Sequence, residues 1–208
     1  SGEYFRDYAF KLADGRRVLF DPFPAYVNFP VRRVRADVVS VSHQHSDHNY
    51  LDKVDGKPLV ADAEGSHDPM PGIRLTGVSA SHDEQGGSLR GSILCMTLQA
   101  EGLKITHLGD LGMVPDEALR HKLFMPDILL VPVGGTYTLD ARAARQTVDA
   151  LQPRIVIPMH YRTEHGGLKE LSTLAPFLEA MAPARASAQP LLRVTREGEA
   201  RAEEVPYA

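Results

Sequence analysis

The sequence is poor in cysteine, in long apolar runs and in excess positive charge, and each shortage excludes a class of protein. One cysteine, Cys95, occurs among 208 residues, so no internal disulfide can form. The apolar neighbours of Cys95 predict a buried structural thiol. No stretch approaches the roughly 20 apolar residues of a membrane-spanning helix. Because the first residues also lack the basic-then-apolar pattern of a signal peptide, we expect a reducing, cytoplasmic setting and no membrane.

The charge balance is slightly acidic, with 23 Lys and Arg against 27 Asp and Glu, which gives a net charge of −4. No basic field is therefore available to recruit nucleic acid, and a small-molecule substrate is expected. Apolar residues make up 43% of the chain, an ordinary value for a globular protein. No long linker, repeat or low-complexity run is visible, so we expect one domain over residues 1–208. Assembly into a homo-oligomer is compatible with the sequence.

The pattern of apolar residues predicts a β-rich first half and a second half in which strands alternate with helices. Strands are expected at 8–12, 17–20, 38–41, 58–61, 73–75, 92–98, 103–107, 128–131 and 154–157. Helices are expected at 51–54, at 140–151 with Asp140 as the N-cap, and at 168–181. A closing hairpin is expected from 191–194 and 201–205. This order favours a mixed α/β (α+β) domain in layers, with the helices outside.

Four side chains of metal-ligand type occur within six residues, directly after the apolar run 38–41: His43, His45, Asp47 and His48. His43 and His45 are two residues apart, so on an extended backbone they project to the same side. Asp47 and His48 follow where the strand should turn, and they can face a second point nearby. Imidazole and carboxylate together suit Zn²⁺, Fe or Mn²⁺ better than Ca²⁺ or Mg²⁺.

Three further ligand-type side chains each follow a predicted strand: His82, Asp110 and His160. The point where a strand becomes a loop is the usual position of site residues on a layered scaffold. Each residue alone is more commonly a hydrogen-bonded polar group, but the run His43–His48 changes that balance. Five histidines and two aspartates suffice for two metal ions that share one carboxylate. We interpret His107 as a supporting or core residue rather than a ligand.

The ordered motifs resemble the metallo-β-lactamase superfamily. His43-x-His45-x-Asp47-His48 matches its signature, and the other matching segments are LFDPF (19–23), HLGDLG (107–112), VPVGGTYT (131–138) and IPMHY (157–161). More closely, the chain is similar to the metal-dependent hydrolases of this fold that are related to L-ascorbate-6-phosphate lactonase. The resemblance spans nearly the whole chain. It implies a four-layer αββα sandwich with a dinuclear metal site along one edge.

The resemblance also implies a role for each ligand. One divalent ion would be held by His43, His45 and His82. The second would be held by Asp47, His48 and His160, with Asp110 bridging the two. Zn²⁺ is the expected metal, with Mn²⁺ and Fe as alternatives. Asp47 and Asp110 are the expected catalytic residues, because Asp47 could also orient the nucleophile and Asp110 would fix the separation of the metals.

This ligand set predicts hydrolysis. Two ions that share a water lower its pKa from about 15.7 toward 7, and the resulting hydroxide attacks a carbonyl or phosphoryl centre. The ligand histidines need partners for their second nitrogens, and Asp21, Asp83 or a backbone carbonyl are candidates, with an Asp-Pro turn that ends the strand as the alternative role of Asp21. Arg90 could bind an anionic group of the substrate, with a surface ion pair as the alternative. Tyr161 could touch substrate, with ordinary packing as the alternative.

Two segments depart from the family pattern: Arg6-Asp7-Tyr8, where a Gly-His turn is usual, and Met113, where His is common. Neither belongs to the ligand set, so they bear on the substrate rather than on metal binding. The leading hypothesis is a hydrolase of a small ester, lactone or phosphoester. The alternatives are a phosphodiesterase or nuclease on the same scaffold, and a catalytically altered or engineered metal-binding member of the fold.

Overall fold

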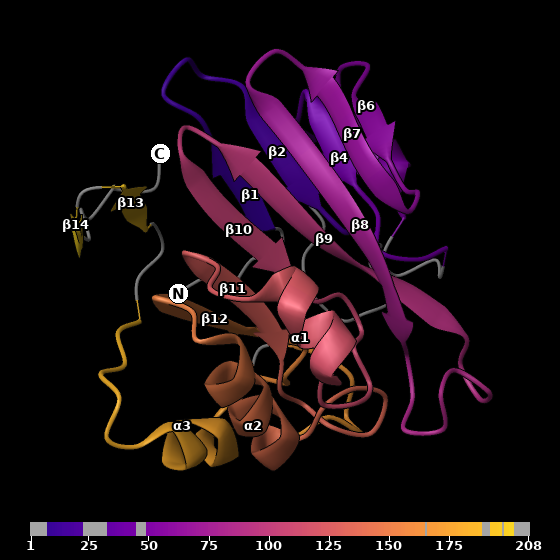
Figure 1. Cartoon of the computed structure of the whole chain (residues 1–208), viewed down its shortest axis with the longest axis vertical. Helices are drawn as coiled ribbons and strands as arrows, with labels where there is room; N and C mark the ends of the chain where they lie inside the picture. The colour runs from indigo at the N-terminus through magenta and orange to yellow at the C-terminus, as the bar shows by residue number, and fades with distance from the viewer. Residues whose placement is uncertain are drawn as a thin grey trace.

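The computed structural model describes residues 8–22, 33–44, 49–164, 166–188, 192–196 and 198–201, the last range by its backbone alone. Two β-sheets pack face to face, and helices lie against the larger sheet (Figure 1). The smaller sheet has the order β1-β2-β4-β6, from the strands β1 (Tyr8–Lys11), β2 (Arg17–Phe20), β4 (Val38–Ser40) and β6 (Leu59–Ala61). The larger has the order β12-β11-β10-β9-β8-β7, from the strands β7 (Gly65–Met70), β8 (Ile73–Ser81), β9 (Ser92–Ala100), β10 (Leu103–His107), β11 (Ile128–Pro132) and β12 (Ile155–Met159).

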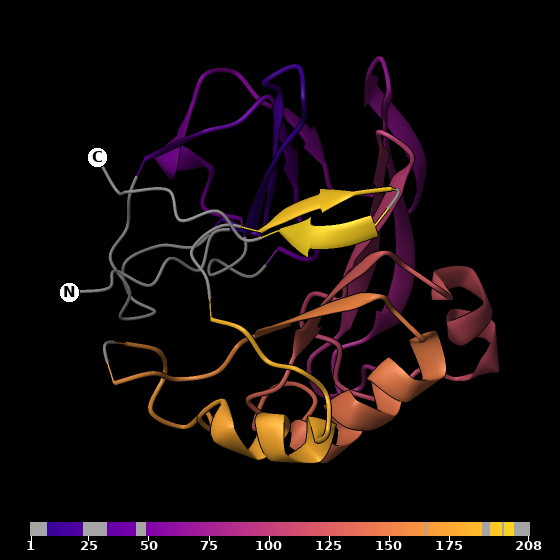
Figure 2. The ribbon, with the colours of Figure 1, turned by 90° about the vertical axis from the view of Figure 1, so that its left-hand side faces the viewer.

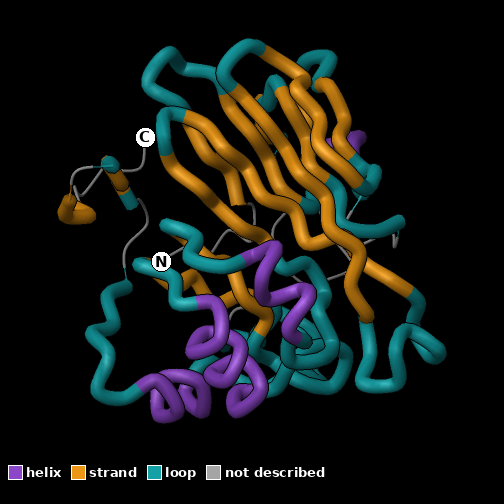
Figure 3. The backbone as a smooth tube through the Cα atoms, viewed as in Figure 1, coloured by secondary structure: helices purple, strands orange, loops and turns teal. Residues whose placement is uncertain are grey.

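The direction of the strands brings several strand ends to one edge of the larger sheet, namely the edge where strands terminate and not the edge formed by an outer strand. β9 is antiparallel to both of its neighbours, β8 and β10, so those two run the same way. β10, β11 and β12 are mutually parallel. The carboxyl ends of β8, β10 and β12 therefore point to the same edge, and the chain turns into loops there, beside the helices (Figure 3). In the smaller sheet, β4 lies parallel to β2 and β6.

The main core fills the space between the two sheets. Val18, Phe20 and Val38 of the smaller sheet pack in one cluster with the larger sheet's residues Leu75, Met96, Leu98 and Leu130. A second cluster lies between the larger sheet and the helices. Along β9 the side chains alternate between the two clusters, with Cys95 toward the helices and Met96 toward the smaller sheet. This two-residue period is the one that a strand buried on both faces requires. Cys95 is fully buried and free, as predicted.

In the described part of the chain, three α-helices cover the larger sheet: α1 (Glu117–Leu123), α2 (Ala141–Leu151) and α3 (Ala175–Met181). α2 confirms the predicted helix and its cap, because the Asp140 carboxylate accepts a hydrogen bond from the Ala143 N–H. The prediction of a helix over 168–181 was wrong for its first half. A helix through that segment would need a hydrogen bond from residue 176 to the Ser172 carbonyl, and Pro176 has no N–H to donate. The helix therefore begins at Ala175.

Short elements complete the described chain: the 3₁₀ helix η2 (Leu51–Lys53) and the strands β3 (Val34–Arg35), β5 (Val54–Asp55), β13 (Arg193–Thr195) and β14 (Gly198–Arg201). β13 and β14 pair as a closing hairpin, on the side of the molecule that Figure 2 faces. Its second strand begins earlier than the predicted 201–205, of which 202–205 lie outside the described residues. In the described part of the chain, the outer face of the smaller sheet is covered by a small cluster that includes Leu19, Val39 and Val54. Among the described residues, no helix is long and apolar enough to span a membrane.

Several described elements escaped the prediction: the short strands β3 and β5, the strand β7 and the helix α1. β7 reads GSHDPM, which is polar and contains a proline, and it forms the edge of the larger sheet with an irregular register to β8. α1 has seven residues, and one of them, Leu123, is buried. Helical periodicity cannot emerge over so short a segment. The expected α/β sandwich is nonetheless the architecture that is observed.

Candidate metal centre

Four of the predicted ligands meet at the shared edge of the sheets. The Asp110 carboxylate lies at the middle: its Oδ2 is 3.2 Å from Nε2 of His82 and 3.6 Å from Nε2 of His43. Its Oδ1 is 2.7 Å from Nδ1 of His160. The side chains of His43, His82 and Asp110 are exposed by 5%, 3% and 9% respectively. The His160 side chain is exposed by 17%, so it lies toward the open side of the cluster.

The chemistry of these groups fits a divalent metal ion. One ligand atom from each of His43, His82 and Asp110 lies within 4.8 Å of the others. Donors around a tetrahedral zinc ion with bonds of about 2.0–2.1 Å are about 3.3–3.4 Å apart. The distances of 3.2 Å and 3.6 Å from Asp110 to the two imidazoles bracket that value. Two neutral imidazoles and one carboxylate are a ligand set that zinc, iron and manganese accept.

A chain of hydrogen bonds orients His43. The Ser42 hydroxyl donates to Oδ2 of Asp21 at 2.6 Å, since an ionised carboxylate only accepts. The hydroxyl oxygen lies 2.8 Å from Nδ1 of His43 and is left to accept from it. The His43 proton is thereby placed on Nδ1, and the Nε2 lone pair faces Asp110. Asp21 thus fills the predicted supporting role through Ser42, and the Ser42 N–H adds a bond of 2.7 Å.

Glycines let the loop around Asp110 pack against the neighbouring ligands. A Cβ on Gly109 would lie 2.8 Å from the Cβ of Ser42. A Cβ on Gly112 would lie 2.4 Å from the carbonyl carbon of His82. Both separations are too short for carbon atoms that are not bonded, so the Asp110 loop can fit between Ser42 and His82 only with glycine at these positions.

His160 is held by a similar contact. A Cβ on Gly134 would lie 1.9 Å from the His160 carbonyl oxygen. His160 also has a φ of 55°, a left-handed conformation that is unfavourable for a residue with a side chain. The Gly134 carbonyl accepts from the Ser172 N–H at 2.9 Å, and the Ser172 carbonyl accepts from the Arg162 N–H at 3.0 Å. The segment before α3 thus secures the loop that carries His160.

Three predicted ligands, His45, Asp47 and His48, lie outside the described residues. The described residues on either side of them are joined, because the Asn49 amide donates to the Gln44 side-chain oxygen at 3.0 Å. The Tyr50 N–H also donates to the Pro22 carbonyl at 2.9 Å. Gln44 and Asn49, the described residues that flank this run, are therefore close in space, and Gln44 directly follows His43 in the chain.

Asp83 has a different role from the one that the sequence suggested. Its carboxylate accepts four backbone N–H groups of the loop that follows His82, from Gln85, Gly87, Leu89 and Arg90, at 2.8–3.0 Å. Burial alone would raise the pKa of this carboxyl, but the four donors outweigh it and hold the pKa below its ordinary value. Asp83 therefore organises the loop after His82.

The remaining predicted residues lie around the cluster. Tyr161 packs against the core on the helix side, so its contact with substrate stays a prediction. His107 is 1% exposed, stacks on Phe20 with ring centroids 5.2 Å apart, and accepts the Gly109 N–H at 3.1 Å. The Tyr8 ring contacts His107 edge-on. These contacts agree with the interpretation of His107 as a supporting core residue.

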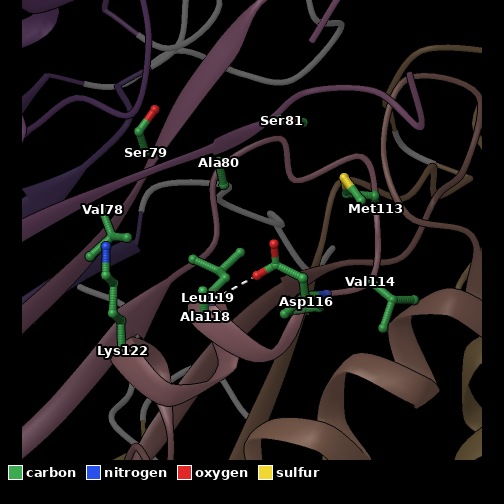
Figure 4. A pocket seen from close by; sticks show the side chains of 11 residues that line it. Val78, Ser79, Ala80, Ser81, Met113, Val114, Asp116, Ala118, Leu119 and Lys122 are labelled. Carbon is green, nitrogen blue, oxygen red and sulfur yellow. Dashed lines mark hydrogen bonds between the residues drawn. The ribbon is translucent and has the colours of Figure 1, made fainter. Parts of the chain in front are cut away.

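Met113, one of the two departures from the family pattern, lines a cavity of about 220 Å³ between the end of β8, residues 113–116 and α1 (Figure 4). Asp116 and Lys122 also border this cavity. Its described lining contains none of the candidate metal ligands. Ser81, the residue before His82, lines the cavity, so the cavity borders the strand that leads to this candidate ligand, and Met113 shapes that space. Arg6 and Asp7 of the other departure lie outside the described residues.

Comparison with known proteins shows the family to which the chain belongs. Residues 4–160 match the model of the β-lactamase superfamily domain. A UPF0173 metal-dependent hydrolase from Methanosphaera stadtmanae is 32% identical over 85% of this chain and 90% of its own length. A metal-dependent hydrolase from Thermococcus onnurineus is 30% identical over 74% of this chain and 81% of its own length.

Solved structures with a similar fold point to the same family. A protein of the metallo-β-lactamase superfamily from Thermotoga maritima, proposed to be a zinc-dependent hydrolase, is 35% identical, with a TM-score of 0.69 over 85% of this chain and 81% of that one. A metallo hydrolase from Ignicoccus hospitalis has the same fold, with a TM-score of 0.63 at 20% identity over 96% of this chain and 95% of that one. The chain therefore belongs to the metallo-β-lactamase superfamily, among its metal-dependent hydrolases.

Proposed function

We propose that this metal-dependent hydrolase uses a dinuclear centre to cleave a small ester, lactone or phosphoester. The position of the Asp110 carboxylate carries the proposal. One of its oxygens faces His43 and His82, and the other faces His160, so a single carboxylate reaches imidazoles on two sides. A carboxylate in that position is suited to bridge two ions.

In this proposal, His43, His45 and His82 hold one ion, and Asp47, His48 and His160 hold the other. Bound divalent ions lower the pKa of a coordinated water toward neutrality and polarise the substrate oxygen. Asp110 keeps the two sets of imidazoles at a constant separation. Asp21 acts through Ser42 to keep the Nε2 lone pair of His43 directed at the centre. Asp47 would orient the attacking water, and Zn²⁺ is the proposed metal.

The substrate is proposed to be a small molecule. The chain has a net charge of −4, which does not favour the polyanionic backbone of a nucleic acid. The phosphodiesterase or nuclease alternative acts on phosphodiesters alone, whereas the leading proposal includes carboxylic esters and lactones. It can therefore be tested with the same metal-loaded protein.

The decisive experiment combines metal analysis with a substrate panel. Protein loaded with Zn²⁺, Mn²⁺ or Fe²⁺ is assayed with lactones, carboxylic esters and phosphodiesters, beside His45→Ala and the exposed control His121→Ala. We expect about two metals per chain and hydrolysis of carboxylic esters or lactones. Activity should be lost in His45→Ala and kept in His121→Ala. If the wild type, fully loaded, cleaved nothing in the panel, the proposal would be wrong, and cleavage of phosphodiesters alone would favour the alternative.

A further inference from the structure

The loop after His82, residues 83–91, is held together by several hydrogen bonds and directly follows a candidate metal ligand. The Asp83 carboxylate, 3% exposed, accepts two backbone N–H groups on each oxygen. The two ends of the loop are joined, because the His82 N–H donates to the Gly91 carbonyl at 3.1 Å. Inside the loop, the Gly91 N–H donates to the Gly87 carbonyl at 2.8 Å. A loop tied at so many points holds Arg90 in a defined position relative to His82.

The side chain of Arg90 reaches across to a second loop of the site. Its guanidinium carbon lies 5.4 Å from the centroid of the Tyr137 ring, a cation–π contact. Tyr137 belongs to the loop of residues 133–139, which packs on His160 through Gly134. The same loop is tied to the residue after Asp110 by a hydrogen bond of 3.0 Å from the Leu139 N–H to the Leu111 carbonyl. The Arg90–Tyr137 pair therefore joins the loop after His82 to the loop that supports His160.

The charge of Arg90 is not neutralised within the described part of the chain. The ion pairs of arginine side chains there involve other residues, namely Arg16, Arg33, Arg74, Arg145 and Arg154. Arg90 is exposed, and the Tyr137 ring is 37% exposed. A guanidinium held near a ring by a cation–π contact still has its N–H groups to donate, in the fork geometry that binds a carboxylate or a phosphate through two hydrogen bonds.

We propose that Arg90, positioned by Asp83 and by its cation–π contact with Tyr137, determines specificity by binding an oxyanion of the substrate that is separate from the cleaved bond. The inference rests on the proposed hydrolytic function and names its substrate class: small esters or lactones that carry a carboxylate or phosphate group. The guanidinium holds one end of the substrate, so the reacting carbonyl is presented to the metal centre in a constant orientation. Tyr137 limits the orientations of the guanidinium.

The test uses three 4-nitrophenyl esters with acyl chains of matched length and the metal-loaded full chain. The glutarate monoester carries a terminal carboxylate, the 4-phosphonobutyrate ester carries a phosphonate, and the valerate ester ends in a methyl group. The quantity measured is kcat/KM for each anionic ester divided by kcat/KM for valerate. The two anionic esters distinguish a carboxylate-bearing from a phosphate-bearing substrate.

We expect Arg90→Gln to lower this ratio about tenfold or more for at least one anionic ester, mainly through KM, because a charge-assisted hydrogen bond is lost. Arg90→Lys should lower it less, since the charge remains and the fork is lost. Tyr137→Leu should also lower the ratio, whereas Tyr137→Phe keeps the ring and should preserve it. Arg142→Gln, which removes an exposed arginine on α2, is the control for net charge.

Equal ratios in the wild type and Arg90→Gln would overturn the assignment of Arg90, and so would an equal fall in Arg142→Gln. A wild type that hydrolyses none of the esters would instead contradict the proposed function. In that case, calorimetric titration with glutarate decides the question of Arg90 separately. The assignment of Arg90 is supported if glutarate binds the wild type and binds Arg90→Gln about tenfold more weakly. Absence of binding, or equal binding, overturns it.

Discussion

Oδ1 of Asp110 and Nδ1 of His160 are 2.7 Å apart, although the two residues follow different strands and are separated by 50 positions in the chain. β10 and β12 both flank β11 and run parallel to it, so their carboxyl ends reach the same edge. The contact joins the residue proposed to bridge two metals to a ligand proposed for the second one. Substitution of Asp110 is therefore the most direct test of the dinuclear centre.

Asp110→Asn should release at least one metal ion per chain. The amide keeps the size of the carboxylate but loses its charge, so it is a poor bridge between two cations. Metal content after dialysis, measured by mass spectrometry, checks this expectation. Asp149→Asn is the matched control, because the Asp149 side chain is 59% exposed and pairs with Arg145 on the surface of α2. Retention of two metals per chain in Asp110→Asn would refute the bridging role.

Ser42→Ala should weaken metal binding about 10–100-fold, the usual effect of removing a group that orients a metal ligand. The variant removes the hydroxyl that connects Asp21 to Nδ1 of His43. Competition with a chromogenic chelator measures the affinity. Ser66→Ala is the control, since its hydroxyl bonds to Thr76 on an exposed part of the larger sheet. An affinity equal to that of the wild type would show that Ser42 does not act on His43.

Gly134→Ala should lower the thermal stability and reduce the occupancy of the metal centre. The added methyl group would lie 1.9 Å from the His160 carbonyl oxygen, so the His160 loop must move. Overpacking of this kind costs about 1–3 kcal/mol, which corresponds to several degrees of Tm for a chain of this length. Gly15→Ala at the β1–β2 turn is the control for backbone strain, since its φ is +90° but no atom lies within 4 Å of the added Cβ. A Tm and a metal content no lower than those of Gly15→Ala would argue against the role of Gly134.

Cys95 should be inert in the native protein. Burial raises the pKa of its thiol from 9.0 to about 12, so the reactive thiolate is scarce at neutral pH. Reaction with Ellman's reagent at pH 8 should proceed only as fast as the chain unfolds, and at once in denaturant. As the pH rises, the thiol ionises in the unfolded chain before it ionises in the folded chain. The contribution of Cys95 to the free energy of unfolding is therefore constant below about pH 9 and falls between pH 9 and 12. Rapid reaction under native conditions would contradict the burial of Cys95.

Local signals account for the parts of the fold that could be predicted. The Asp140 cap and the periodicity of α2 depend on neighbouring residues alone, and both are present in the structure. The error over 168–174 has a local cause as well, since Pro176 shifts the start of α3. β7 was missed because its pairing with β8 comes from the sheet and not from its own composition.

The sequence by itself determined which side chains of ligand type follow each buried strand, because strand patterns and ligand-type residues can be recognised within short segments of the chain. Only the tertiary structure decided which atoms meet. The parallel directions of β8, β10 and β12 bring His82, Asp110 and His160 to one edge. The glycine contacts, the link from Asp21 through Ser42 to His43 and the Arg90–Tyr137 pair join residues that are distant in the chain. Such contacts depend on strand register and close packing, and no local pattern encodes either.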